Sequence, residues 1–192
     1  MKGKLTVLIL AVIALALYGT VPVHAAPITY TVLSTGSGTL GSNSFSDAQV
    51  RVSFAGDTSN VTGSGFYTNN VGTGTVSIAG LGTATFLDSI YAFDNQGAIA
   101  AGIGDSTAQG SILDTYHSAF GSYDLTTAIG PLSGGSFYRN YLGYSTNLGV
   151  LSFSAMSSSS TFTAGAVPLP GAMWLFGPGL VGLAAVRRQF KK

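Results

Sequence analysis

Hydrophobic and polar side chains alternate with a period of two along much of the chain. Residues 28–33 (Ile-Thr-Tyr-Thr-Val-Leu) place every second side chain on the same face, and residues 45–54 keep this period after one irregular step. Strands with one buried face show such alternation. Further short runs of the same kind lie at residues 71–78, 84–87, 89–93, 98–103 and 148–156.

Glycine-rich turns separate these runs at a spacing of roughly ten residues, which is typical of antiparallel β-sandwiches and jelly rolls. Helix signals are weak, because residues 26–165 contain no Glu or Lys and many Gly and β-branched residues. Only residues 114–120 predict a short helical turn. The pattern therefore predicts a mainly β protein with a single antiparallel β-sandwich or jelly-roll-like domain over residues 26–164. Four serines at 157–160 predict the end of this domain, and residues 163–167 a short linker.

The first 25 residues have the features of a secretory signal peptide. Lys2 and Lys4 form a positive start, residues 5–17 are an apolar run of thirteen, and Val23 and Ala25 supply small side chains at the −3 and −1 positions. This predicts an N-terminal signal helix that is cleaved after Ala25. An uncleaved anchor is the alternative, but the run is short for a helix that spans a bilayer.

The other end of the chain has the length and charge of a membrane anchor. Residues 166–186 contain 21 uncharged residues, which as a helix would span about 30 Å, the thickness of a hydrocarbon core. Trp174 lies near the outer end of this run, where an indole favours the headgroup region. Basic residues follow the run and predict a cytoplasmic C-terminus: Arg187, Arg188, Lys191 and Lys192. We expect a C-terminal transmembrane helix.

A proline motif precedes this apolar run, and it reads Val167, Pro168, Leu169, Pro170 and Gly171. The two prolines fix φ and lack an N–H group, so they favour an extended segment that a processing enzyme can accept. A plain anchor would account for the apolar run and the arginines but not for this motif.

The segment 165–192 resembles the PEP-CTERM sorting domain of Gram-negative bacteria, in the variant that reads V-P-L-P-A. The resemblance implies an exported protein that is held in the inner membrane by its C-terminal helix. An integral-membrane exosortase would then process it and release it to the cell surface or extracellular matrix. Leu169 stands where the namesake motif has Glu, and Gly171 where the variant has Ala, which leaves the exosortase subtype open.

Charge and cysteine content exclude several classes of function. Between the two terminal segments the chain carries two arginines against seven aspartates, a net charge of −5. A basic footprint for nucleic acid is therefore absent, and we expect no nucleic-acid partner. The chain has no cysteine, so disulfides, thiolate metal sites and a cysteine nucleophile are excluded.

No catalytic, metal or cofactor site is predicted, and we expect a protein that is not an enzyme. His117 is the single histidine outside the signal peptide, residues 36–41 match G-x-G-x-x-G without a helix to follow, and no serine lies in a G-x-S-x-G motif. The aspartates at 94 and 105 fall in sequences typical of turns. A secreted hydrolase remains an alternative that would need two aspartates to converge in a cleft.

The densest aromatic segment is residues 137–144 (Phe-Tyr-Arg-Asn-Tyr-Leu-Gly-Tyr). Its rings could stack on sugars while Arg139 and Asn140 bind hydroxyl groups, or they could be core residues and cross-strand pairs. We therefore predict a non-enzymatic protein of the bacterial cell surface or matrix. The alternative function is an exopolysaccharide-binding module that uses this patch.

Overall fold

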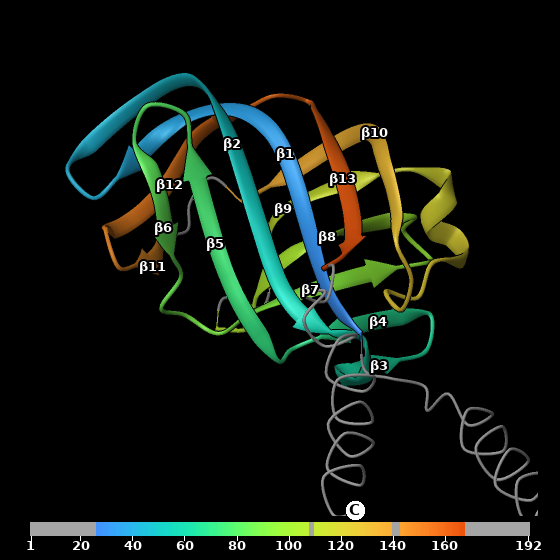
Figure 1. The fold of residues 1–192 in the computed structure, drawn as a ribbon. Helices are drawn as coiled ribbons and strands as arrows, with labels where there is room; N and C mark the ends of the chain where they lie inside the picture. Colours follow the sequence, from blue (N-terminus) through green and yellow to red (C-terminus); the bar gives the residue numbers. More distant parts are fainter. Residues whose placement is uncertain (1–25, 108–109, 140–142, 168–192) are drawn as a thin grey trace, which may run out of the picture.

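The computed structural model describes residues 26–107, 110–139 and 143–167. Within these ranges the chain forms thirteen strands and two short 3-10 helices (Figure 1). The strands are β1 Pro27–Leu40, β2 Asn43–Asp57, β3 Val61–Gly63, β4 Phe66–Asn69, β5 Gly72–Ile78, β6 Gly82–Thr85, β7 Ile90–Asn95, β8 Ala100–Asp105, β9 Gly110–Tyr116, β10 Ile129–Tyr138, β11 Gly143–Thr146, β12 Gly149–Met156 and β13 Ser159–Ala166. The helices are η1 Thr58–Asn60 and η2 Ser118–Ser122.

All thirteen strands belong to one antiparallel sheet. Its main order is β3-β4-β7-β8-β9-β10-β13-β1-β2-β5-β6, and β12 pairs with both β1 and β11 beside this path. The prediction of a mainly β, antiparallel domain is confirmed.

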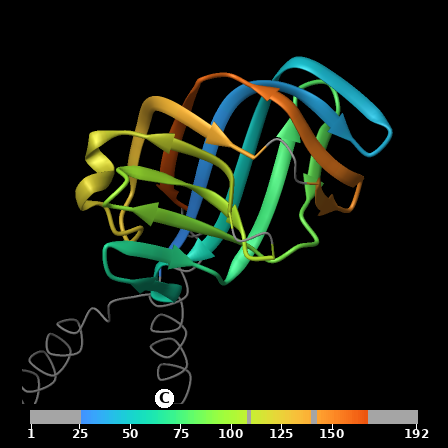
Figure 2. The same cartoon turned by 180° about the vertical axis from the view of Figure 1, so that it is seen from behind.

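The sheet curls until its two halves face each other. In Figure 1 β5, β2, β1 and β13 form the near layer, while β7, β8 and β9 run behind them; Figure 2 shows the same halves from the opposite side. A sandwich has two separate sheets, whereas here β10 and β13 connect the halves by continuous strand pairing. The architecture is thus a curled sheet, or half-barrel, with the core inside the curl.

The curl closes at one end. Phe86, which follows β6, forms a bridge with Thr146 of β11, and the N–H of Asn147 donates to the carbonyl oxygen of Thr85 at 3.0 Å. Since β11 pairs with β12 and β12 with the second half of β1, this bridge completes a ring of strands. The bend that β1 needs falls at Gly36–Gly38, where its pairing register shifts. A Cβ on Gly38 would overlap the Ser152 carbonyl oxygen.

Aromatic rings on the inward side fill the core. Tyr30 and Phe54 are fully buried and stack at 6.4 Å between ring centroids, and the Tyr30 hydroxyl donates to the carbonyl oxygen of Leu125 at 2.7 Å. Phe120 of η2 meets Phe162 of β13 edge to face at 5.3 Å. This helix therefore covers one end of the core.

The outward side of β13, β1, β2, β5 and β6 carries mainly small hydroxyl side chains. Thr31 pairs with Ser53 and Ser53 with Thr75 in register, and the hydroxyls of Thr31 and Ser53 lie 3.1 Å apart. The same row continues to Thr163 on one side and to Thr85 on the other. We call this surface the hydroxyl face.

Two predictions about the chain's last folded segment are wrong. The serines at 157–160 do not end the domain, and residues 163–167 are not a linker, because β13 continues to Ala166 between β10 and β1. The predicted helical turn at 114–120 is also displaced: β9 continues to Tyr116, and η2 begins at Ser118.

The two ends of the domain lie side by side. Ile28 pairs with Ala166, and the N–H of Val167 donates to the carbonyl oxygen of Pro27 at 2.9 Å. No helix within the described ranges is long and apolar enough to cross a membrane. The predicted signal helix and transmembrane helix fall outside those ranges.

Candidate functional site

The predicted aromatic patch at 137–144 does not form one surface. Strand alternation sends Phe137 outward, 46% exposed, while Tyr138 turns inward and meets Phe153 edge to face at 6.4 Å between centroids. Tyr144 of β11 is fully buried against Phe86 and Phe153. Asn140, Tyr141 and Leu142 lie outside the described residues. Of the two interpretations of this segment, core packing holds for Tyr138 and Tyr144, and the single sugar-binding patch does not form.

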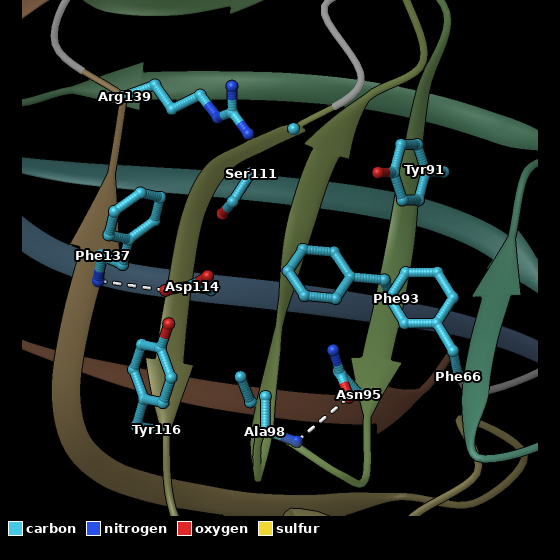
Figure 3. A pocket seen from close by; sticks show the side chains of 12 residues that line it. Phe66, Tyr91, Phe93, Asn95, Ala98, Ser111, Asp114, Tyr116, Phe137 and Arg139 are labelled. Carbon is cyan, nitrogen blue, oxygen red and sulfur yellow. Dashed lines mark hydrogen bonds between the residues drawn. The ribbon is translucent and has the colours of Figure 1, made fainter.

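Phe137 and Arg139 belong to a groove on the outward side of β4, β7, β8, β9 and β10, with β1 and β2 running behind the sheet (Figure 3). We call this surface the aromatic face. The groove has a volume of about 250 Å³. It is lined by Phe66, Tyr91, Phe93, Asn95, Ala98, Ala100, Gly110, Ser111, Asp114, Tyr116, Phe137 and Arg139.

Strand register brings these distant residues together. Phe93, Gly102, Asp114 and Phe137 form one row across β7 to β10, since each is the pairing partner of the next. A second row in the same way joins Phe66, Asn95, Ala100 and Tyr116 across β4 to β9. Residues two apart on a strand share a face, so both rows point into the groove.

The floor of the groove is low because β8 presents almost no side chain on this side. Its outward positions are Ala100, Gly102 and Gly104. A Cβ on Gly102 would lie 2.5 Å from the Cβ of Asp114, and one on Gly104 would lie 2.6 Å from Cζ of Tyr91. Glycine is therefore required at position 102, where a Cβ would also lie 2.5 Å from the Leu113 carbonyl oxygen, whereas at position 104 the Tyr91 ring would have to shift.

Aromatic rings form the walls. The rings of Phe66 and Phe93 stack nearly parallel, with their centroids 6.0 Å apart and 18° between their planes. The centroid of the Tyr91 ring lies 6.0 Å from that of Phe93. Phe66 is 45% exposed and Tyr116 39% exposed. With Phe137, three of the five rings in the groove thus offer a large part of their surface to solvent.

Polar groups lie among these rings. The Asp114 carboxyl is almost buried and accepts a hydrogen bond from the Phe137 N–H at 3.0 Å. Burial raises the pKa of Asp114 to about 6, although the hydrogen bond from the Phe137 N–H acts in the opposite direction. Asn95 accepts from the Ala98 N–H at 3.0 Å, and Arg139 lies at the opposite end of the groove (Figure 3).

Asp94 lies on the other side of the same sheet, inside the core. It is fully buried, and neither carboxyl oxygen has a hydrogen-bond partner. Burial, and then the negative charge of Asp124, raises the pKa of Asp94 to about 7. The two expected turns are present at residues 96–99 and 106–107, although Asp94 and Asp105 themselves lie at the ends of β7 and β8. Asp105 contributes to its turn, because its carboxylate accepts a hydrogen bond from the Thr107 N–H at 2.6 Å. Asp94 and Asp114 point to opposite faces, so they do not form the carboxylate pair that a hydrolase would need.

The remaining sequence motifs have structural roles. His117 accepts the Ala119 N–H on Nδ1 at 3.1 Å and so caps η2. Residues 36–40 of the glycine-rich match continue strand β1 and open no helix. In the part of the chain that the structure describes, no three His, Asp or Glu side chains gather in a way that could hold a metal ion.

The predicted sorting and cleavage residues fall mostly outside the described ranges. Val167 is the last described residue, and it hydrogen-bonds to Pro27. The others lie outside: Val23, Ala25, Pro168, Leu169, Pro170, Gly171, Trp174, Arg187, Arg188, Lys191 and Lys192.

Comparison with known protein families, with characterised proteins and with solved structures found no match to this chain.

Sequence reasoning missed most of the groove. Only Phe137 and Arg139 were among the candidate residues, because the other lining residues come from four further strands. One signal was present: Tyr91, Phe93 and Asn95 alternate with the inward residues of β7, so large rings occupy the side that elsewhere carries Thr and Ser.

Proposed function

We propose that this protein is an exported component of the bacterial cell surface or extracellular matrix, and that its β domain is the part that is delivered. In this proposal residues 1–25 are a signal peptide, and residues 165–192 a sorting tail with a transmembrane helix. The folded domain has a binding or structural role and is not an enzyme.

The observation that supports the proposal is the position of the domain's ends. Strand β1 begins at Pro27, two residues after the predicted cleavage site at Ala25, and β13 ends at Ala166, one residue before the predicted motif. The sheet thus fills the interval between the two predicted processing signals. Cleavage after Ala25 and cleavage within the motif would leave all thirteen strands intact.

Within this proposal the chain is the substrate of an exosortase. The prolines at 168 and 170 present an extended segment to the enzyme, the apolar run positions this segment at the inner membrane, and Arg187 and Arg188 fix the topology. Because β13 ends at Ala166, a cleft that accepts the motif would also have to accommodate the adjacent edge of the domain.

The test is to replace Pro168 and Pro170 together with Ala and to map the C-terminus of the cellular protein by mass spectrometry. We expect the wild type to lose Lys192 and the double variant to retain it. Pro178→Ala is the matched control, since it removes a proline from the apolar run but leaves the motif intact, and its C-terminus should be processed. A wild-type chain that keeps an intact Lys192 in the mature fraction would contradict the proposal.

A further inference from the structure

We propose that the groove on the aromatic face binds neutral hexopyranose units of a polysaccharide chain. The inference concerns what the domain does and goes beyond its delivery. It would stand even if the tail were processed in another way.

The first step is that the groove exposes rings which the fold does not require there. Phe66, Tyr116 and Phe137 are each 39–46% exposed. Leaving apolar surface in water is unfavourable by roughly 25 cal/mol per Å², and a gathered apolar patch on a protein surface commonly marks a binding site. A ligand that covers these rings would recover this free energy.

The second step is that the groove combines flat apolar walls with polar groups. A pyranose ring has a face of C–H groups and a rim of hydroxyls. The exposed ring of Phe66, which stacks on the buried ring of Phe93, offers a platform for the C–H face. The Asp114 carboxylate can accept hydrogen bonds from rim hydroxyls, because a carboxylate has about four acceptor sites and the Phe137 N–H takes one of them.

The size of the groove selects among ligands. Its volume of about 250 Å³ lies just below the roughly 300–1,000 Å³ of sites for drug-sized molecules. A helix about 10 Å across does not fit such a space. A single sugar ring does, and the neighbouring rings of a polysaccharide could continue along the open face.

The backbone around the groove disfavours an extended peptide. Strands β8 and β9 are paired on both sides, whereas a peptide that adds a strand needs a free sheet edge. Charge favours a neutral ligand, because the groove holds one arginine and one aspartate and the domain as a whole is acidic. Neutral hexoses meet all of these conditions together.

The test is isothermal titration calorimetry on the full chain in a detergent without a sugar headgroup. The probes are cellohexaose and mannohexaose as neutral hexose chains, an alginate hexamer as an acidic sugar, and a phenylalanine-containing hexapeptide as a non-sugar ligand for an apolar surface. We expect at least one neutral hexamer to bind, and both the acidic hexamer and the peptide to bind at least tenfold more weakly.

Variants connect binding to the groove. Phe66→Ala and Phe137→Ala should each weaken binding of that hexamer tenfold or more, and Asp114→Asn should weaken it as well. Leu87→Ala is the control, because Leu87 is a 68% exposed apolar residue that does not line the groove. This variant should bind the hexamer with the affinity of the wild type. Circular dichroism should show that all four variants are folded.

Three results would overturn the inference: no binding of either neutral hexamer, equal binding of the acidic hexamer or the peptide, or wild-type affinity in both phenylalanine variants. None of these results bears on tail processing, which is measured separately by mass spectrometry. Failure of the groove and failure of the sorting proposal are therefore distinguishable.

Discussion

The hydroxyl face and the aromatic face are two outward surfaces of the same sheet. Both belong to antiparallel strands whose inward side chains fill one core. On β1, β2 and β5 the outward row is Thr31, Ser53 and Thr75, whereas on β7, β9 and β10 the outward positions include Phe93, Asp114 and Phe137. The strands can therefore carry small hydroxyl residues at their outward positions. Folding alone does not explain why the aromatic face carries large rings at the equivalent positions.

Buried acids separate the two halves further. Among the described residues the buried carboxyl groups are those of Asp94, Asp105 and Asp114, which lie on β7, β8 and β9. Burial disfavours the charged forms of Asp94 and Asp114 and raises the pKa of both, so these two groups weaken the fold at neutral pH. The half of the sheet with the groove is thus the half in which polar chemistry reduces stability.

The largest expected effect separates rings that hold the fold from rings that cover the aromatic face. Tyr144→Ala should reduce the free energy of unfolding by about 3–5 kcal/mol, because it removes a fully buried ring that contacts Phe86 and Phe153. Urea unfolding followed by circular dichroism measures this loss. Tyr144→Phe keeps the ring and should retain most of the stability. A loss below 1 kcal/mol for the alanine variant would contradict the assignment of Tyr144 to the core.

The second effect is a pH dependence that arises beneath the aromatic face. The pKa of Asp94 is raised from 3.8 to about 7 in the folded state, so the folded state holds its proton at pH values where the unfolded chain has lost it. Stability should therefore be highest below pH 4, fall as the pH rises towards 7, and stay low above it. This single group accounts for a decrease on the order of 4 kcal/mol.

Asp94→Asn is the variant that isolates this group. Its free energy of unfolding, measured in urea from pH 4 to pH 8, should fall less steeply than that of the wild type. The stability of the variant relative to the wild type should increase as the pH rises, because an amide does not ionise. Asp47→Asn serves as the control, since Asp47 is exposed in β2 of the other half. If the free energy of unfolding depends on pH in the same way in Asp94→Asn and in the wild type, the raised pKa of Asp94 is contradicted.

A smaller effect is expected from the groove's own rings. Phe66→Ala should change the free energy of unfolding by about 1 kcal/mol or less, because Phe66 is 45% exposed and stacks on Phe93 at the surface. Thermal unfolding of the purified protein provides the measurement. A loss as large as that of Tyr144→Ala would make Phe66 a core residue and remove the contrast between the two faces.

The smallest effect is expected on the hydroxyl face. Thr31→Val keeps the branched shape but removes the hydroxyl that lies 3.1 Å from that of Ser53. The free energy of unfolding should change by less than about 0.5 kcal/mol, as at most surface positions. Urea unfolding again measures it. If the loss exceeds 2 kcal/mol, the hydroxyl row is itself a stabilising element of the sheet.

The sequence predicted the strands whose two faces differ in polarity. Alternation located β2, β5, β6, β7, β8 and β12 to within a few residues, but it found only the first half of β1, which continues to Leu40. It missed β3, β4, β9, β10, β11 and β13. In β10 and β13 most positions on both faces are Gly, Ser, Thr or Ala, so polarity does not alternate clearly. The Ser-Ser-Thr-Phe-Thr-Ala-Gly-Ala of β13 therefore resembles a linker, although it pairs on both sides.

The groove could not be predicted in the same way. It depends on which residues become neighbours across five strands, and pairing register carries that information. Gly102 means little in the sequence, yet the register places it between Phe93 and Asp114. The sequence did contain the outward alternation of Tyr91, Phe93 and Asn95, but nothing in it indicated that a row of small residues would lie alongside.

The central position of β13 sets an order on folding. A chain is synthesised from its N-terminus, so β1 appears first and its neighbour β13 last. Until residues 159–166 have emerged, the first half of β1 lacks one partner, and the connection between β10 and β1 is missing. Contacts between residues so far apart in sequence form slowly. Residues 159–166 therefore join the two halves of the sheet. The curled sheet cannot be completed until these residues have been synthesised.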